Sequence, residues 1–249
     1  KEVLDDLPDL TESVQYCSMH DEQYNLYIEE KAKIRNALLS SMEKDDIREA
    51  NMIVIQGLTK LRQLANHPKM IENEEGQVSE DGSGKFDEVI RMLESLIAEN
   101  HKVLLFSSFV KHLNLFKEYF DEQNWKYSML TGSTSDRSGQ IQKFQEEEDR
   151  QLFLISLKAG GVGLNLTSAD YVFFLDPWWN PAAENQALSR AHRIGQKNKV
   201  MVYRFITEES IEQKILKLQE RKKELADVFI NNNNPFKQLS KADIVDLFN

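Results

Sequence analysis

The 249-residue sequence has few of the residues that build disulfide frameworks, fibrous repeats or membrane spans. Its single cysteine, Cys17, excludes an internal disulfide and a zinc site made of several cysteines, and is typical of a reducing compartment. Ten glycines and five prolines exclude a collagen-like or low-complexity chain. No apolar run approaches the ~18 residues of a membrane span, and no signal-peptide pattern opens the chain. We therefore expect a folded, soluble, intracellular protein without a membrane partner.

The sequence also lacks a phosphate-binding loop with which the chain could hold a nucleoside triphosphate alone. The nearest candidate is the segment Gly82–Phe86. The position five residues before Gly84 is Ser79 rather than glycine, and Phe86 has no hydroxyl for magnesium. We interpret this segment as the start of a helix. Five scattered histidines give no metal spacing, and no serine or cysteine nucleophile has a matching histidine pattern, so we expect no resident metal site.

The net charge of -10 argues against a generic nucleic-acid-binding protein, because affinity for the phosphate backbone comes from lysine and arginine. The acidity is concentrated in residues 1–100, which carry 22 acidic and 11 basic residues, whereas residues 101–249 carry 19 and 20. The stretch 156–204 holds six basic residues and three acidic ones. One local surface can therefore meet phosphate.

The pattern of apolar residues predicts an α-helical hairpin followed by a doubly wound α/β domain. Two helices are expected over 21–66, with a break near 44–46 and an end at His67-Pro68. An acidic, glycine-containing linker covers 72–84. Continuously apolar strands then alternate with helices, which is typical of a parallel sheet covered on both faces. The expected strands are 103–109, 127–130, 151–157, 171–175 and 200–206, and the expected helices are 85–100, 111–123, 135–146, 182–193 and 208–230, the last with Thr207 as its N-cap.

A glycine-rich segment, residues 156–167, follows the third expected strand. Open α/β sheets bind ligands at the carboxyl ends of their strands, and exposed amides in a glycine turn can hold an anion. A tight turn without a ligand is the alternative interpretation.

Two arginines offer the strongest candidate for phosphate chemistry. Arg190 and Arg193 are three residues apart, which places them on one face of the expected helix, with Gln186 one turn earlier. Two guanidinium groups and an amide suit a polyphosphate, because they bind its oxygens bidentately and stabilise developing charge. A salt-bridged surface helix is the alternative. His192 points away from this face of the expected helix, and we expect it to have a structural role.

Five ordered motifs resemble the C-terminal motor lobe of Swi/Snf-type ATPases, which are helicase-related superfamily-two DNA translocases with bacterial members. The motifs are Leu-Leu-Phe-Ser-Ser-Phe (104–109), Leu-Thr-Gly-Ser-Thr (130–134), Ala-Gly-Gly-Val-Gly-Leu-Asn-Leu (159–166), Asp-Pro-Trp-Trp-Asn-Pro (176–181) and Arg-Ala-His-Arg-Ile-Gly-Gln (190–196). The resemblance covers nearly the whole chain. It implies a RecA-like sheet over 85–206, a helical protrusion within 1–71, the linker 72–84, and a brace helix and tail over 207–249.

The resemblance also implies roles for individual residues. Arg190 and Arg193 match the motif VI arginines, catalytic residues that reach ATP bound by a first lobe, with Arg193 as the finger. The residues implied on the ATP side are Gln186, Gly161, Gly163 and Asn165. The residues implied at the DNA backbone are Ser107, Ser108, Thr131, Gly132, Ser133, Lys158, Trp178, Trp179 and Asn180. For the paired tryptophans, core packing is an equal alternative to DNA contact.

The sequence departs from the family pattern in two ways. Thr131 stands where the family more often has aspartate. The first lobe, which would bind most of the ATP and Mg²⁺, is absent, so we expect this chain to be inactive alone. It would work with that N-terminal RecA-like lobe of the same protein, on double-stranded DNA and an unidentified remodelled target. The alternatives are a free-standing Rossmann-like nucleotide-binding protein and a non-enzymatic interaction module.

Overall fold

The fold was analysed in a computed structural model of the chain, which describes residues 8–44, 47–72, 79, 81–159, 165–178, 181–193, 195–196, 198–224 and 247–248. The chain forms two compact units. The sheet unit comprises Lys1–Tyr16 and Asp87–Ile206, and the helical unit comprises Cys17–Phe86 and Thr207–Asn249. Each unit has buried apolar residues of its own.

The sheet unit is built on six strands in the order β1-β6-β5-β2-β4-β3. The strands are β1 (Leu10–Cys17), β2 (Val103–Ser107), β3 (Lys126–Leu130), β4 (Arg150–Ser156), β5 (Tyr171–Phe174) and β6 (Val200–Thr207). Strands β2 to β6 pair in parallel, with Val103 opposite both Leu152 and Tyr171. The constant offset of the hydrogen bonds from Val200 to Asp9 and from Glu208 to Cys17 places β1 parallel to β6 as well.

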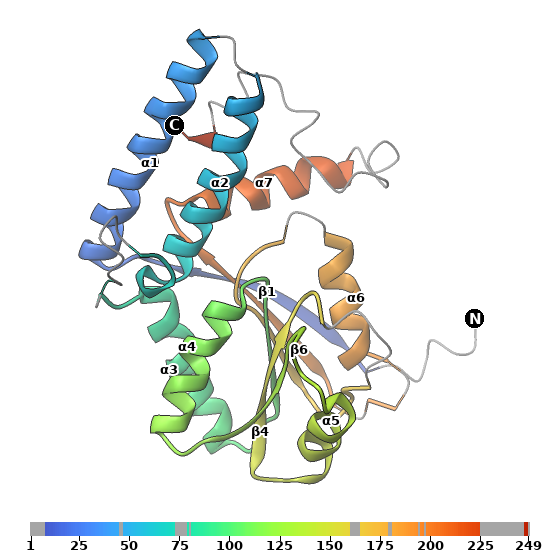
Figure 1. The fold of residues 1–249 in the computed structure, drawn as a ribbon. Helices are drawn as coiled ribbons and strands as arrows, with labels where there is room; N and C mark the ends of the chain where they lie inside the picture. The colour runs from blue at the N-terminus through green and yellow to red at the C-terminus, as the bar shows by residue number, and fades with distance from the viewer. Residues whose placement is uncertain are drawn as a thin grey trace. The chain divides into compact units, whose positions relative to one another are not determined.

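Helices cover the sheet on both faces, as the continuously apolar strands predict (Figure 1). Helices α5 (Arg137–Glu146) and α6 (Pro181–Ala191) contribute Phe144 and Leu188 to a core that includes Phe106, Phe153 and Phe174. Helices α3 (Gly84–Ala98) and α4 (Val110–Glu122) lie on the opposite face. The predicted doubly wound α/β class is confirmed, and no helix of the described chain is long and apolar enough to cross a membrane.

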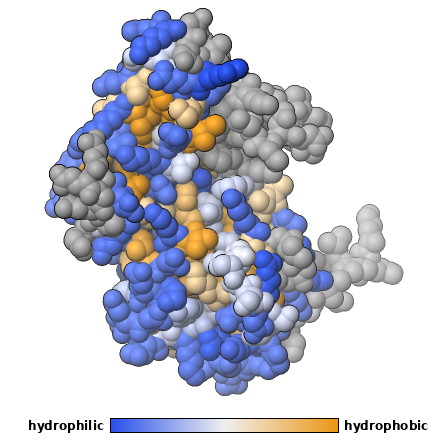
Figure 2. All heavy atoms as spheres, in the orientation of Figure 1, coloured by the Kyte–Doolittle hydropathy of each residue, from blue (hydrophilic) through white to orange (hydrophobic). Residues whose placement is uncertain are grey.

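The helical unit contains the predicted hairpin. Helix α1 (Asp21–Glu43) and α2 (Ile47–Asn66) are followed by a short 3-10 helix, η1 (Pro68–Met70), and the unit also holds α7 (Ile211–Glu224). The hydroxyl of Tyr27 on α1 accepts a hydrogen bond of 2.7 Å from the first backbone N–H of α7. Figure 2 shows apolar atoms among hydrophilic ones over the hairpin, where Met52 and Ile55 are about half exposed.

The structure differs from the sequence prediction at two places, and a third expectation is described only in part. Strand β1 was not predicted, because its residues alternate irregularly between apolar and polar types. Thr207 is not an N-cap: it is the last residue of β6, and Ser210 caps α7 by accepting a hydrogen bond from the N–H of Glu212. Helix α7 is observed as far as Glu224, and the remaining part of the expected helix lies outside the described residues.

Candidate functional site

The candidate site begins at the carboxyl edge of the parallel sheet. Strand β2 continues through α4 towards β3, whereas the neighbouring β5 continues through α6 towards β6, so the two connections leave in opposite directions. Such a switch point is where open α/β sheets bind ligands. Ser107 ends β2 and Ser108 follows it, whereas Asp176 follows β5. The topology therefore brings two sequence motifs together at the usual ligand position.

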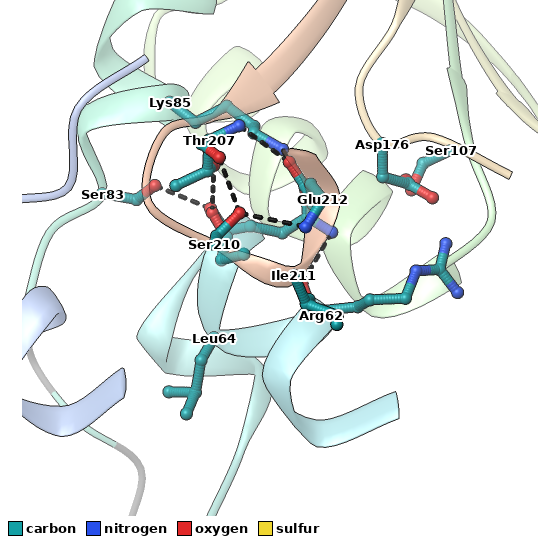
Figure 3. Close-up of polar contacts among 12 residues, drawn as sticks. Arg62, Leu64, Ser83, Lys85, Ser107, Asp176, Thr207, Ser210, Ile211 and Glu212 are labelled. Carbon is teal, nitrogen blue, oxygen red and sulfur yellow. Dashed lines mark hydrogen bonds and ion pairs between the residues drawn. The ribbon is translucent and has the colours of Figure 1, made fainter. Parts of the chain in front are cut away.

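Asp176 joins these two motifs through hydrogen bonds. Its buried carboxylate accepts from the hydroxyl of Ser107 at 2.5 Å, from the backbone N–H of Ser108 at 3.2 Å, and from the hydroxyl of Ser108 (Figure 3 for Ser107 and Asp176). Each hydroxyl has one proton to donate. In this arrangement both serines give that proton to Asp176, and Ser107 is fully buried. Sequence reasoning gave Asp176 no role at this site.

A second turn at the same edge follows β3. The backbone N–H of Thr131 donates to the hydroxyl of Thr134 at 2.9 Å, and the hydroxyl oxygens of Thr131 and Ser133 lie 3.0 Å apart. Thr131 is buried, whereas Gly132 and Ser133 are exposed. A Cβ at Gly132 would meet nothing within 4 Å, so the space around this backbone is open. The turn holds Thr131 in place and presents the next two residues.

The glycine-rich segment is described only at its two ends. Lys158 and Asn165 are both exposed, and the carbonyl of Asn165 accepts a hydrogen bond of 2.8 Å from the side chain of Gln145. The implied sites at Gly161 and Gly163 lie outside the described residues.

The segment that follows β5 contains the paired tryptophans. Trp178 is partly buried and packs against the core of the sheet unit, which agrees with the packing interpretation. Its backbone N–H donates to Glu184 on α6 at 2.9 Å. Trp179 and Asn180 are outside the described part of the chain.

Helix α6 carries Gln186 and Arg190 but not Arg193, because it ends at Ala191. The expectation that both arginines share one helical face is therefore wrong. Gly195 has a φ of +104°, a left-handed conformation that cannot continue the helix. The buried side chain of Gln196 donates to the carbonyls of Ala169 at 2.7 Å and Ala191 at 3.2 Å, which caps the last turn.

The two arginines still lie close together in the chain, with different surroundings. Arg190 is partly buried, and its Nε atom is buried without a hydrogen-bond acceptor among the described residues. Arg193 is exposed in the turn after the helix. Between them, His192 lies 2.8 Å from the carbonyl of Pro8, which fits its expected structural role. Of the two arginines, only Arg193 presents an exposed guanidinium group to an anion from outside.

The described residues contain no group of three or more histidine, cysteine or acidic side chains that could hold a metal ion. The exposed guanidinium of Arg193 has the charge and the donors that an anionic group such as a phosphate requires.

The chain is similar to known helicase sequences. Residues 84–195 match the helicase conserved C-terminal domain. An uncharacterized ATP-dependent helicase of Mycoplasma pneumoniae is 34% identical over 249 residues, which are 99% of this chain and 23% of that protein. The chain therefore spans less than a quarter of that relative's length.

Two solved structures are similar over nearly the whole chain. The C-terminal domain of the Sulfolobus solfataricus SWI2/SNF2 ATPase has a TM-score of 0.77 at 28% identity, and covers 96% of this chain and 98% of its own. The same ATPase core in complex with double-stranded DNA has a TM-score of 0.80 at 28% identity, and covers 99% of this chain and 51% of its own. The chain therefore belongs to the Swi2/Snf2 family of ATPases, of which it has the C-terminal, RecA-like lobe.

Proposed function

We propose that this chain is one half of an ATP-driven motor that moves along double-stranded DNA. ATP would bind between this lobe and a first RecA-like lobe, together with Mg²⁺, and Arg190 and Arg193 would contact its phosphates. The family's ATP-dependent helicase relative and the DNA complex of the Sulfolobus core support the proposal. We retain the limits 1–71, 72–84, 85–206 and 207–249 as proposed domains of this lobe.

The observation that carries the ATP role is the buried Nε donor of Arg190, which has no acceptor in the described chain. Burying such a donor costs about 1–3 kcal/mol unless it finds a partner. Because Nε is covered in this lobe, a phosphate oxygen from a nucleotide held by the first lobe would satisfy it only after the side chain of Arg190 turns outward. Arg193, exposed in the adjoining turn, would add charge stabilisation as phosphate transfer proceeds. Gln186 on α6 and Asn165 after the glycine-rich segment would complete this side, with Gly161 and Gly163.

The DNA role rests on the carboxyl edge of the sheet. Ser108, Gly132 and Ser133 would offer amides and hydroxyls to backbone phosphates, and exposed Lys158 would add one positive charge. Ser107 and Thr131 are buried and would support these contacts from behind. Trp178, Trp179 and Asn180 remain proposed contacts at the start of α6. Since few of these groups are cationic, binding would depend only weakly on salt.

The experiment uses a longer protein that contains this chain and a first lobe. Arg193→Ala should lower the DNA-stimulated ATP turnover number by about three to five decades while ATP affinity changes little, as expected for an arginine finger. Arg91→Ala is the matched control, because Arg91 is an exposed arginine paired with Glu88 on α3. Unchanged turnover in Arg193→Ala would reject the finger assignment. The 249-residue chain alone should hydrolyse no ATP.

A further inference from the structure

Two buried carboxylates flank the connection between β5 and α6: Asp176 follows β5, and Glu184 lies in the first turn of α6. The proposed motor function uses neither of them. Asp176 is 0% exposed and Glu184 is 3% exposed. Carboxylates are seldom buried so completely unless they are bound by several donors. Both are held in this way, and each ties the connection to a different part of the sheet unit.

Glu184 fixes the beginning of α6. One of its oxygens accepts the backbone N–H of Trp178 at 2.9 Å, and the other accepts Nε of Arg204 on β6 at 3.1 Å. Arg204 also pairs with Glu12 on β1 and lies 5.4 Å from the ring centre of Phe174. Burial raises the pKa of Glu184, which the hydrogen bond from Trp178 and the charge of Arg204 partly oppose. The arginine-bearing helix is thus tied to residue 178.

Asp176 fixes the other end of the same short segment. Only the buried Pro177 separates Asp176 from Trp178, and its ring restricts the backbone between the two anchors. The side chain of Asp176 is bound to Ser107 at the end of β2 and to Ser108 in the following loop, which would face DNA. Hydrogen bonds at Asp176 and at Trp178, joined by the short backbone segment 176–178, therefore connect the proposed DNA loop to the helix that carries Arg190.

The donors bound to Asp176 are those that a DNA phosphate would need. A phosphate oxygen only accepts hydrogen bonds, and the hydroxyl and N–H of Ser108 both point to Asp176. Ser108 cannot give the same proton to both acceptors. In addition, a phosphate that approaches Ser108 also approaches the like charge of Asp176. DNA contact at Ser108 therefore requires Asp176 to release it.

We propose that Asp176 is an internal substitute for a DNA phosphate, and that its displacement by duplex DNA links DNA binding to the arginine-bearing helix. This inference rests on the proposed function. Without DNA, Asp176 satisfies Ser108 and holds the segment 176–178 in its present position. When a phosphate takes the donors of Ser108, the segment 176–178 is released at Asp176. Helix α6, which is tied to Trp178 through Glu184, can then shift with this segment. Asp176 is thus a positioning residue that makes hydrolysis depend on DNA.

The test uses the two-lobed protein and a fluorescein-labelled DNA duplex, with binding followed by fluorescence anisotropy in the absence of nucleotide. Asp176→Asn weakens the internal acceptor and removes its charge, so the dissociation constant for the duplex should fall about tenfold, the factor that one charge-assisted hydrogen bond supplies. The ratio of DNA-stimulated to basal ATPase activity should fall as well. A residue that only stabilised the fold would not tighten DNA binding while reducing its effect on turnover.

Asp121→Asn is the matched control, because it removes one exposed carboxylate from the end of α4 and should leave both readouts unchanged. Ser107→Ala should change the dissociation constant in the opposite direction. Ser107 is fully buried, and its loss would leave Asp176 more dependent on Ser108, so the dissociation constant should rise about threefold. This second variant preserves the test if Asp176→Asn does not fold, as judged by circular dichroism.

Unchanged or weaker duplex binding in folded Asp176→Asn would overturn the inference, as would unchanged or tighter binding in Ser107→Ala. The proposed function is tested separately in the same assay, because it requires that the unmodified protein bind the duplex. If only the inference fails, the unmodified protein will still bind the duplex, but the dissociation constants of the two variants will not change in the expected directions.

Discussion

The buried ion pair between Lys85 and Glu212 allows a quantitative test of what holds the helical unit together. Nζ of Lys85, in the first turn of α3, lies 2.6 Å from Oε2 of Glu212 in α7, and both side chains are 0% exposed. Lys85 also donates to the side chain of Asn66 at the end of α2, and Glu212 accepts the backbone N–H of Thr207 at 2.8 Å (Figure 3). Three segments distant in sequence therefore meet at one charge pair.

The first change is Lys85→Met, which keeps the length of the side chain and removes its charge. Glu212 would then remain buried with a negative charge and without its cation. Breaking a buried pair in this way costs about 3–5 kcal/mol of folding free energy. Replacing both partners, as Lys85→Met with Glu212→Gln, leaves no buried charge and retains an acceptor for Thr207. The double variant should therefore be more stable than Lys85→Met alone.

The assay is hydrogen–deuterium exchange of the 249-residue chain, read by mass spectrometry in peptides from α2 and α7. A loss of about 3–5 kcal/mol corresponds to exchange faster by roughly two to three and a half decades in amides that open with the whole unit. Lys33→Met is the control within the same unit, because Lys33 and Glu29 form an exposed pair on α1. It should leave exchange in these peptides unchanged.

Two results would refute this reasoning. Lys85→Met with exchange close to that of the unmodified chain would mean that the pair contributes little to the helical unit. A double variant as destabilised as the sum of its two single variants would mean that the two side chains act independently, without the coupling that their contact requires.

Two further predictions concern single buried side chains. Burial lowers the pKa of His67 to about 4, so protonation of the imidazole opposes the folded state. The free energy of unfolding should be at its full value above pH 6.5 and fall by about 3 kcal/mol as the pH drops towards 4. Urea denaturation of the chain at a series of pH values should show this loss, and a His67→Asn variant that retained the full slope would contradict it. Gln196→Ala removes the donor that caps α6 and should cost about 1–3 kcal/mol in the same assay, whereas Gln142→Ala, on the exposed face of α5, should cost almost nothing. Equal effects of the two glutamine variants would show that the cap does not stabilise α6.

Local sequence determined most of the secondary structure, because periodicity and strong breakers act over a few residues. The buried strands β2 and β4 follow their continuous apolar runs, and α2 ends at Asn66, directly before His67-Pro68. The helix expected over 85–100 is observed as α3 (Gly84–Ala98), with the hydroxyl of Ser83 accepting the N–H of Phe86. The order of the motifs was sufficient to indicate the Swi2/Snf2 family.

Tertiary structure decided which polar side chains meet. Asp176 binds Ser107 from 69 positions away, and Glu212 binds Lys85 from 127 positions away, so no local spacing could reveal either pair. It also decided where Arg193 lies, because Gln196 reaches Ala169 and ends α6 before that arginine. Hydrophobic periodicity is a property of neighbouring residues, whereas the burial of a charge depends on which distant donors the fold brings to it. The sequence therefore determined the architecture and the candidate motifs, and the parallel sheet determined that Asp176 already holds the donors proposed for DNA.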